Sequence, residues 1–167
     1  MLDGSADGLA AILATPGLRP WLPLPLTAAI AIVDARRQII PDGLNAALAA
    51  GGAAIVLIEA QGEIVVRLGG AALVYLGLVA LCASYRRLRG RTGLGRGDVK
   101  FMAASCLWTG LGGLPVMVLA ASLSALAYVG TLRAAGRPVT PTTRVPFGPF
   151  LALGLHASLA WAAFAPA

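Results

Sequence analysis

Residues 93–113 read GLGRGDVKFMAASCLWTGLGG, a glycine-rich basic turn that runs directly into a long apolar segment. The only acidic residue in this stretch is Asp98, which stands where the turn ends and the apolar segment begins. A carboxylate at the edge of hydrocarbon is costly to keep and usually marks a functional site. The stretch therefore predicts a membrane-spanning helix that begins at a working carboxylate.

A second aspartate stands in the mirror-image position. Asp34 ends an apolar segment and is followed almost at once by the basic pair Arg36 and Arg37. If that segment ends at the membrane face where the one after Asp98 begins, the two side chains can form a carboxylate dyad. Such dyads carry out aspartyl proteolysis, so the pair predicts a peptidase.

The composition predicts a membrane protein. Of the 167 residues, 58% are hydrophobic and only 12% are charged, whereas a soluble domain usually carries about 25% charged residues. The net charge of +6 comes from basic residues in short turns between apolar runs. This pattern is typical of membrane topology and of contact with anionic lipid headgroups. No interleaving of basic and aromatic residues indicates that the partner is a nucleic acid.

The expected fold class is an all-α polytopic membrane protein that forms a single domain over residues 1–167. About six transmembrane helices are expected, near residues 20–35, 43–59, 68–85, 99–113, 115–132 and 147–164. A membrane-spanning helix needs about 20 residues. The first and fourth segments are shorter, and they are the two that meet the aspartates, which favours polar helix ends facing a water-filled cleft.

The basic residues predict the orientation of these helices. Eleven of the 13 lysines and arginines fall in the turns that follow the first, third and fifth segments. Basic turns tend to stay in the cytoplasm, so these turns are expected to be cytoplasmic and both termini periplasmic. Asp34 and Asp98 then lie at the same, cytoplasmic face. Trp21, Trp108 and Trp161 fall near outer segment ends, where tryptophan typically anchors a helix at the interface.

The cysteines and the single histidine predict no metal site and no cofactor. Cys82 and Cys106 lie in different apolar segments and no CxxC pair occurs, so buried free thiols are the simplest interpretation. No metal-ligating residue stands at a suitable spacing from His156. We therefore expect His156 to be packed or hydrogen-bonded.

Three stretches together resemble the bacterial prepilin peptidases, also called type IV leader peptidases. Residues 93–104 (GLGRGDVKFMAA) are similar to their second aspartate motif and residues 34–42 (DARRQIIPD) to their first. Residues 146–154 (PFGPFLALG) are similar to the segment that opens their last helix. The three stretches occur in the family's order. The GxGD sequence ending at Asp98 also resembles that of the archaeal preflagellin peptidases and the presenilins.

The resemblance implies an intramembrane aspartic endopeptidase of the bacterial inner membrane, in which Asp34 and Asp98 are catalytic. The implied substrates are type IV prepilins or pseudopilins, which serve pilus assembly and protein secretion and lose a short basic leader at the cytoplasmic face. Membrane lipid is the other expected partner. Many full-length members also carry a domain with paired CxxC motifs and N-methylate the new pilin terminus. The sequence has no such domain, so methyltransferase activity is not expected.

Eight further residues of these motifs are expected to contact substrate or to shape the site: Pro41, Gly95, Gly97, Lys100, Pro146, Phe147, Gly148 and Pro149. Gly95 and Gly97 would permit close backbone approach or a positive φ, or form only a flexible turn. Lys100 would bias the charge of the dyad, meet lipid phosphate, or act only in topology. Residues 146–149 form either an irregular lead-in that shapes the site or a simple helix start. Asp42 is interpreted as a helix cap rather than a third catalytic acid.

The expected helix ends predict different protonation states for the two aspartates. Asp98 begins a helix, where the helix dipole favours an anion by about 0.3–1 kcal/mol, and Asp34 ends one, where the dipole disfavours an anion. Asp98 is therefore the expected base and Asp34 the protonated partner. Arg36 and Arg37 oppose this assignment for Asp34.

A different class of function also fits two carboxylates in a membrane. A small proton-coupled transporter or channel subunit would use Asp34 and Asp98 as a proton relay. Such a protein would conduct ions in proteoliposomes and tolerate substitution of Gly95 and Gly97. A peptidase would instead lose cleavage when either aspartate becomes asparagine.

Overall fold

The computed structural model describes residues 18–91, 93–138, 140 and 145–164. Among these residues every regular element is a helix and no strand occurs. The elements in chain order are η1 (Arg19–Trp21), α2 (Leu24–Arg37), α3 (Asp42–Glu59), η2 (Gln61–Glu63), α4 (Ile64–Arg89), α5 (Arg96–Ala134) and α6 (Gly148–Phe164). The predicted all-α fold is confirmed for this part of the chain.

Three helical segments are long and apolar enough to cross a membrane: α3, the 29-residue run Gln61–Arg89, and the 39-residue α5. The apolar helix α6 is shorter, with 17 residues. The surface of α4 fits the same environment, because large apolar side chains along it are exposed, among them Val65, Val66, Leu73, Leu76 and Leu81. The helices are therefore consistent with a membrane protein.

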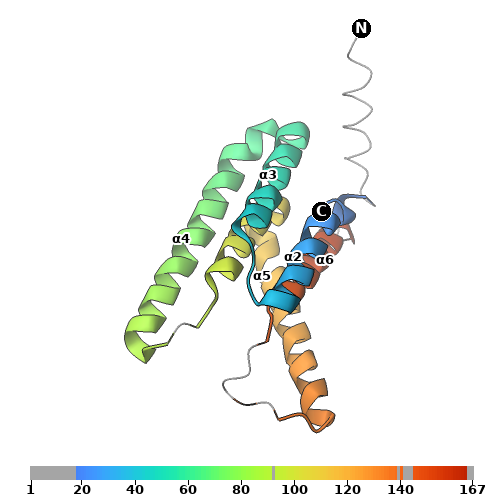
Figure 1. Ribbon diagram of the computed structural model, residues 1–167. Helices are drawn as coiled ribbons and strands as arrows, with labels where there is room; N and C mark the ends of the chain where they lie inside the picture. The colour runs from blue at the N-terminus through green and yellow to red at the C-terminus, as the bar shows by residue number, and fades with distance from the viewer. Residues whose placement is uncertain (1–17, 92, 139, 141–144, 165–167) are drawn as a thin grey trace.

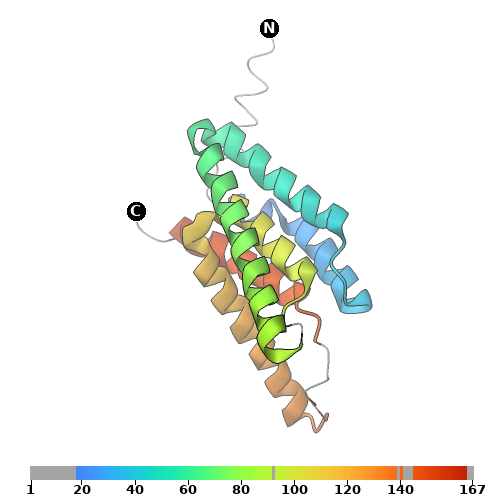
Figure 2. The same ribbon diagram turned by 90° about the vertical axis from the view of Figure 1, so that its left-hand side faces the viewer.

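Helix α5 is divided into two arms at Gly110. This residue has φ 68° and ψ 177°, which is not helical and is a conformation that only glycine adopts readily. Both views show the chain folding back on itself there, so that residues 96–109 and 111–134 run in opposite directions (Figures 1 and 2). The arms correspond to the predicted segments 99–113 and 115–132, with the break inside the first of them.

The first arm of α5 is buried along most of its length, and α5 as a whole contacts α3, α4 and α6. The core includes the fully buried Leu48, Phe101, Met117 and Leu151. The contact with α6 is close because both helices carry small residues at the crossing. A Cβ atom at Gly154 would collide with the backbone carbonyl of Met117. The α6 helix is thereby held against the second arm of α5.

His156 ties α6 to the beginning of the described chain. Its Nδ1 lies 2.7 Å from the carbonyl oxygen of Pro20, and its Nε2 lies 2.9 Å from Thr27 Oγ1 in α2. Because a carbonyl oxygen only accepts, Nδ1 is the donor to Pro20. The expectation of a hydrogen-bonded histidine is confirmed, and the contact fixes α2 against α6.

One predicted interfacial tryptophan is instead part of the core. Trp108 is only 7% exposed, and its indole N–H donates to the carbonyl oxygen of Leu48, 2.8 Å away. The indole fits there because Gly52 has no side chain: a Cβ at that position would lie 2.9 Å from the ring nitrogen. Trp21 and Trp161 are 60% and 65% exposed, as interfacial residues should be.

The helix ends that carry the sequence motifs lie on one side of the molecule. Figures 1 and 2 show the C-terminal ends of α2 and α4 on the same side as the N-terminal ends of α3, α5 and α6. The basic turns at these ends therefore lie on the side that holds the two aspartates. On the opposite side two ion pairs occur, Arg19 with Glu59 and Arg67 with Glu63, each at 3.1 Å.

Candidate active site

Asp34 lies in the last turn of α2 and faces the beginning of α6. Its side chain is 5% exposed, and its Oδ2 accepts a hydrogen bond of 2.7 Å from the backbone N–H of Gly148. A Cβ atom at position 148 would lie 2.9 Å from both the Cβ and the Oδ2 of Asp34. Glycine at this position is therefore what lets α6 approach the carboxylate.

The chain turns sharply after Asp34 because Gln38 adopts a left-handed conformation, with φ 54° and ψ 36°. Its N–H donates to the carbonyl oxygen of Asp34, 2.8 Å away, which ends α2. Pro41 is extended and immediately precedes α3. No sequence motif singles out Gln38. The usable signal is Pro41, because proline disfavours a helical residue before it and so indicates that α2 ends before this point.

Asp98 is the third residue of α5 and is half-buried. Its carboxylate interacts with the backbone of Gly95, the residue that caps the helix. A Cβ at position 95 would lie 2.7 Å from Asp98 Oδ2, so the glycine gives the carboxylate its space. The predicted helix positions are confirmed: Asp98 lies at a helix N-terminus and Asp34 at a C-terminus.

Gly95 and Gly97 allow close packing, and the alternative of a positive φ is wrong for both. Gly95 is extended with φ −68°, and Gly97 lies within α5. A Cβ at Gly97 would lie 2.9 Å from the Cβ of Ile40. The carbonyl oxygen of Gly97 also accepts a 3.2 Å hydrogen bond from Asn45 Nδ2. These contacts hold the start of α5 against the segment that leads into α3.

Two adjoining cavities of about 550 Å³ each are lined by both aspartates. Asp34, Gln38, Gly95 and Asp98 line both of them. The first cavity, the α3-side cavity, is completed by Ile39, Ile40, Asp42, Arg96, Gly97 and Lys100. The second, the α6-side cavity, is completed by Gly93, Leu94, Val145, Pro146 and Phe147.

Lys100 and Asp42 form an ion pair of 2.6 Å at the edge of the α3-side cavity. The interpretation of Asp42 as a capping side chain is wrong, because no side-chain hydrogen bond caps α3. Its carboxylate turns to the ammonium group across the cavity edge instead. The charge of Lys100 is thereby balanced by Asp42 beside the dyad.

Residues 145–147 form an irregular wall, and α6 begins directly after it. Pro146 and Phe147 line the α6-side cavity. The carbonyl oxygen of Phe147 accepts the N–H of Leu151 at 3.0 Å, which is the first turn of α6. Pro149 is the second residue of the helix, where its missing N–H is not needed, and it does not line either cavity. The segment thus shapes the site and also starts a helix.

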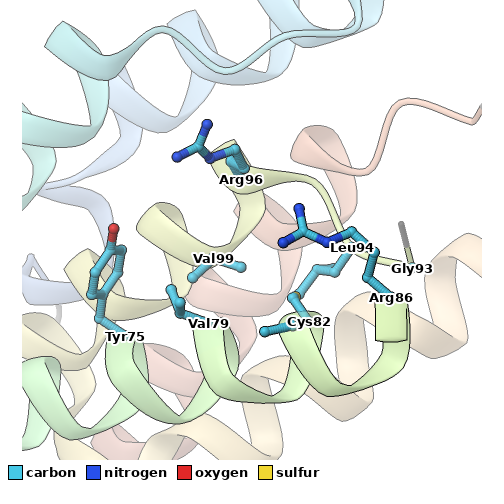
Figure 3. Close-up of a pocket in the computed structure, with 9 residues that line it drawn as sticks. Tyr75, Val79, Cys82, Arg86, Gly93, Leu94, Arg96 and Val99 are labelled. Carbon is cyan, nitrogen blue, oxygen red and sulfur yellow. The ribbon is translucent and has the colours of Figure 1, made fainter. Parts of the chain in front are cut away.

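A third cavity, the arginine cavity of about 320 Å³, lies between α4 and the start of α5 (Figure 3). Val79, Cys82 and Val99 form its apolar part, and the polar tips of Tyr75, Arg86 and Arg96 stand around them (Figure 3). It shares Gly93 and Leu94 with the α6-side cavity and Arg96 with the α3-side cavity. No ion-pair partner for Arg86 or Arg96 occurs among the residues that the structure describes.

The described residues contain no group of three or more histidine, cysteine or acidic side chains arranged to hold a metal ion. Cys106 is buried and Cys82 is half-buried, both as free thiols. The two carboxylates of the site stand beside two cavities, each with room for a peptide segment or for several water molecules.

Comparison with known proteins relates this site to a family. The sequence model of the type IV leader peptidase family matches residues 21–130, which include both aspartates. Three similar proteins, each named prepilin leader peptidase/N-methyltransferase, come from Dickeya chrysanthemi (34% identical over 156 residues), Dichelobacter nodosus (32% over 126) and Aeromonas salmonicida (31% over 165).

These alignments cover most of this chain but only part of each relative. They include 92%, 75% and 96% of this chain and 55%, 42% and 56% of the respective relatives. The chain therefore spans about half the length of the curated relatives that it matches. No solved structure matches it significantly.

Proposed function

The chain belongs to the type IV leader peptidase family, and from this membership we propose that it is an intramembrane aspartic endopeptidase. Its proposed substrates are type IV prepilins or pseudopilins, from which it removes the basic leader. The observation that carries the proposal is that Asp34 and Asp98, which come from distant parts of the sequence, line the same two cavities.

The proposed reaction uses the two carboxylates as a base and an acid that share one proton. Asp98, ionised, removes a proton from a water molecule whose oxygen attacks the scissile carbonyl carbon. Asp34, protonated, gives its proton to the carbonyl oxygen. When the C–N bond breaks, Asp98 returns its proton to the leaving nitrogen, and the proton of one hydroxyl of the intermediate returns to Asp34.

The helix ends at which the two carboxylates stand support this division of roles. Asp98 stands at the N-terminus of α5, where the helix dipole favours an anion. Asp34 stands at the C-terminus of α2, and the N–H of Gly148 occupies its Oδ2. Because that oxygen is an acceptor, the proton of Asp34 belongs on Oδ1.

The proposed position of the site is the cytoplasmic face of the bacterial inner membrane, with both termini on the periplasmic side. The charge distribution supports it, since the helix ends next to the basic turns and the aspartates lie on one side of the molecule (Figure 1). The six spans are α2, α3, α4, the two arms of α5, and α6, and they form a single peptidase domain. The methyltransferase activity in the relatives' names is not part of this proposal.

Anionic lipid is the proposed second partner. A basic leader would be repelled by the arginines around the site unless their charge is balanced. The arginine cavity supports a lipid phosphate as that balance, because it combines two arginines without ion-pair partners and an apolar wall. A bound headgroup would then let the leader approach the carboxylates.

The proton-relay alternative has no support of its own. Family membership supports a peptidase, and the close packing of Gly95 and Gly97 fits a shaped site better than a pore that tolerates their substitution. Ion flux through the purified protein in proteoliposomes, without cleavage of any prepilin, would favour the relay instead.

The direct test is to incubate the purified protein in lipid vesicles with a leader-bearing prepilin and to sequence the new N-terminus of the product. We expect a single cut between the leader and the apolar segment that follows it. The matched control is the same prepilin without its leader, which should remain unchanged. Absence of the cut, or cuts at unrelated positions, would contradict the proposal.

A further inference from the structure

A groove leads away from the carboxylates between α3, α4 and the first arm of α5. This alanine groove has a volume of about 400 Å³ and is walled by the small side chains Ala46, Ala49, Ala71, Ala103 and Ala104. Its lining is almost wholly apolar except at one end.

The polar end of the alanine groove joins it to the candidate active site. Asp42 and Lys100 line both the groove and the α3-side cavity, and their ion pair stands where the two meet. A substrate whose scissile bond lies at Asp34 and Asp98 can therefore continue into the groove without leaving the surface of the protein.

The groove walls are suited to a helix. Lys100, Ala103, Ala104 and Leu107 are spaced as one face of the first arm of α5, so the groove runs along that helix axis. Small side chains let a second helix come close, which is how helices associate within a membrane. The segment that fits is apolar and helical, and it begins at the cleaved bond.

A buried polar atom in the groove wall lacks a partner. Asn45 lines the groove and is only 4% exposed, and its Nδ2 is used by the carbonyl oxygen of Gly97. Its Oδ1 is buried without a hydrogen bond in the structure. An unmatched buried acceptor is costly. When a substrate helix unwinds near the cut, one of its backbone N–H groups loses its acceptor and needs a new one.

We propose that the alanine groove holds the apolar helix on the C-terminal side of the scissile bond. Asn45 turns its unpartnered Oδ1 toward the groove, where this oxygen accepts a hydrogen bond from a backbone N–H of the segment as it unwinds toward the carboxylates. This inference rests on the proposed peptidase function and specifies the part of the substrate that the protein recognises outside the catalytic pair.

The test compares two substrates and three variants. One substrate is a prepilin with its leader and apolar segment, in vesicles, and the other is a short peptide that spans the same bond and ends before the apolar segment. Ala46→Phe and Ala71→Phe fill the groove from α3 and α4. Ala54→Phe, at an exposed position of α3 outside the groove, is the matched control.

We expect each groove variant to lose about 10-fold or more of kcat/KM for the prepilin, since apolar pocket contacts discriminate by that factor. The same variants should cleave the short peptide within about twofold of the unsubstituted protein, as should the control with both substrates. Equal cleavage of the prepilin by all variants would overturn the inference and leave the groove to another occupant, such as a lipid chain. Equal loss for both substrates would also overturn it.

A crosslinking measurement keeps the inference testable if the phenylalanine variants fold poorly. A photoreactive phenylalanine analogue at the exposed position 46, in protein also carrying Asp98→Asn, should crosslink to the apolar segment of the uncleaved prepilin. The same analogue at position 54 should not. Crosslinks to the leader alone would contradict the inference. Failure of the unsubstituted protein to cleave either substrate would instead reject the proposed function itself.

Discussion

At the residue scale, the carboxylate of Asp34 depends on a neighbour that has no side chain. The N–H of Gly148 donates to its Oδ2 at 2.7 Å, and a methyl group at position 148 would lie 2.9 Å from that oxygen. Real Cβ atoms do not come so close, so any larger residue must push α2 and α6 apart. The orientation of the Asp34 carboxylate thus depends on the absence of a side chain at Gly148.

Gly148→Ala should therefore impair both the fold and the reaction. Overpacking of this kind typically destabilises a protein by about 1–3 kcal/mol. We expect a lower midpoint of thermal unfolding in detergent and a reduced kcat for the folded fraction. The control is Gly43→Ala, where a Cβ would have nothing within 4 Å. Equal activity and stability of the two variants would contradict the packing argument.

Asp34→Asn and Asp98→Asn should each abolish measurable prepilin cleavage, because an amide neither ionises as a base nor donates the acid's proton. General acid–base groups typically contribute about 10²–10⁴-fold to a rate. Both variants should insert and fold as the unsubstituted protein does, which circular dichroism can check. Glu63→Gln, which removes a carboxylate on the opposite side of the molecule, should retain most of the activity. Cleavage by either Asp34→Asn or Asp98→Asn would reject the proposed mechanism.

The sequence predicts the helix ends at which the two aspartates stand, because the cost of a carboxylate in a membrane is visible without coordinates. It fails where a role depends on a partner distant in the chain. Trp108 reaches Leu48 across 60 residues, and Asp42 turns to Lys100 across 58. The left-handed Gln38 was missed because only the following proline pointed to it.

At the element scale, the division of α5 brings a central helix pair into place. Gly110 lets the chain reverse (Figure 2), and the second arm contributes Met117 and Ala121 to the core. The sequence predicts a break here, since glycines and Pro115 crowd the region, yet it places the break a few residues late. The reason is that Pro115 is accommodated inside the second arm, whereas the conformation at Gly110 is not helical.

Gly110→Ala should destabilise the protein more than a glycine replacement elsewhere in the same turn. The conformation at position 110 is strained for an alanine by about 1–3 kcal/mol, and the new Cβ would also lie 3.1 Å from Arg67 Nη1. Gly112→Ala is the control, because a Cβ there meets nothing within 4 Å. Thermal unfolding of both variants in detergent measures the difference. Equal midpoints would mean that the turn does not require glycine.

At the scale of the whole molecule, the helix ends that carry the two aspartates and the two arginines lie on one side (Figure 1), and the alanine groove leads away from them. The order of apolar segments and basic turns along the chain predicts that these charged residues share one side of the molecule. This order does not predict the cavities, which form between segments that are distant in the sequence. The alanine groove has no signal in the sequence that separates it from ordinary helix packing.

The charge on that side predicts a dependence on lipid. In vesicles, prepilin cleavage should rise as the anionic lipid fraction rises, and Arg86→Gln with Arg96→Gln should weaken that dependence. Each basic contact to an anionic surface is worth about 1 kcal/mol, or about fivefold in binding. Arg133→Gln, at an exposed position in the last turn of α5, is the control. Cleavage that is indifferent to lipid charge would contradict the role of the arginine cavity.

The hydrogen bond between Gly148 and Asp34 has a consequence for timing. Phe147 forms part of the wall of the α6-side cavity, and the next amide along the chain donates to Asp34, the proposed acid. A peptide that displaces the wall therefore also shifts the amide that holds the acid's oxygen. Binding of a substrate and reorientation of the Asp34 carboxyl would then occur together.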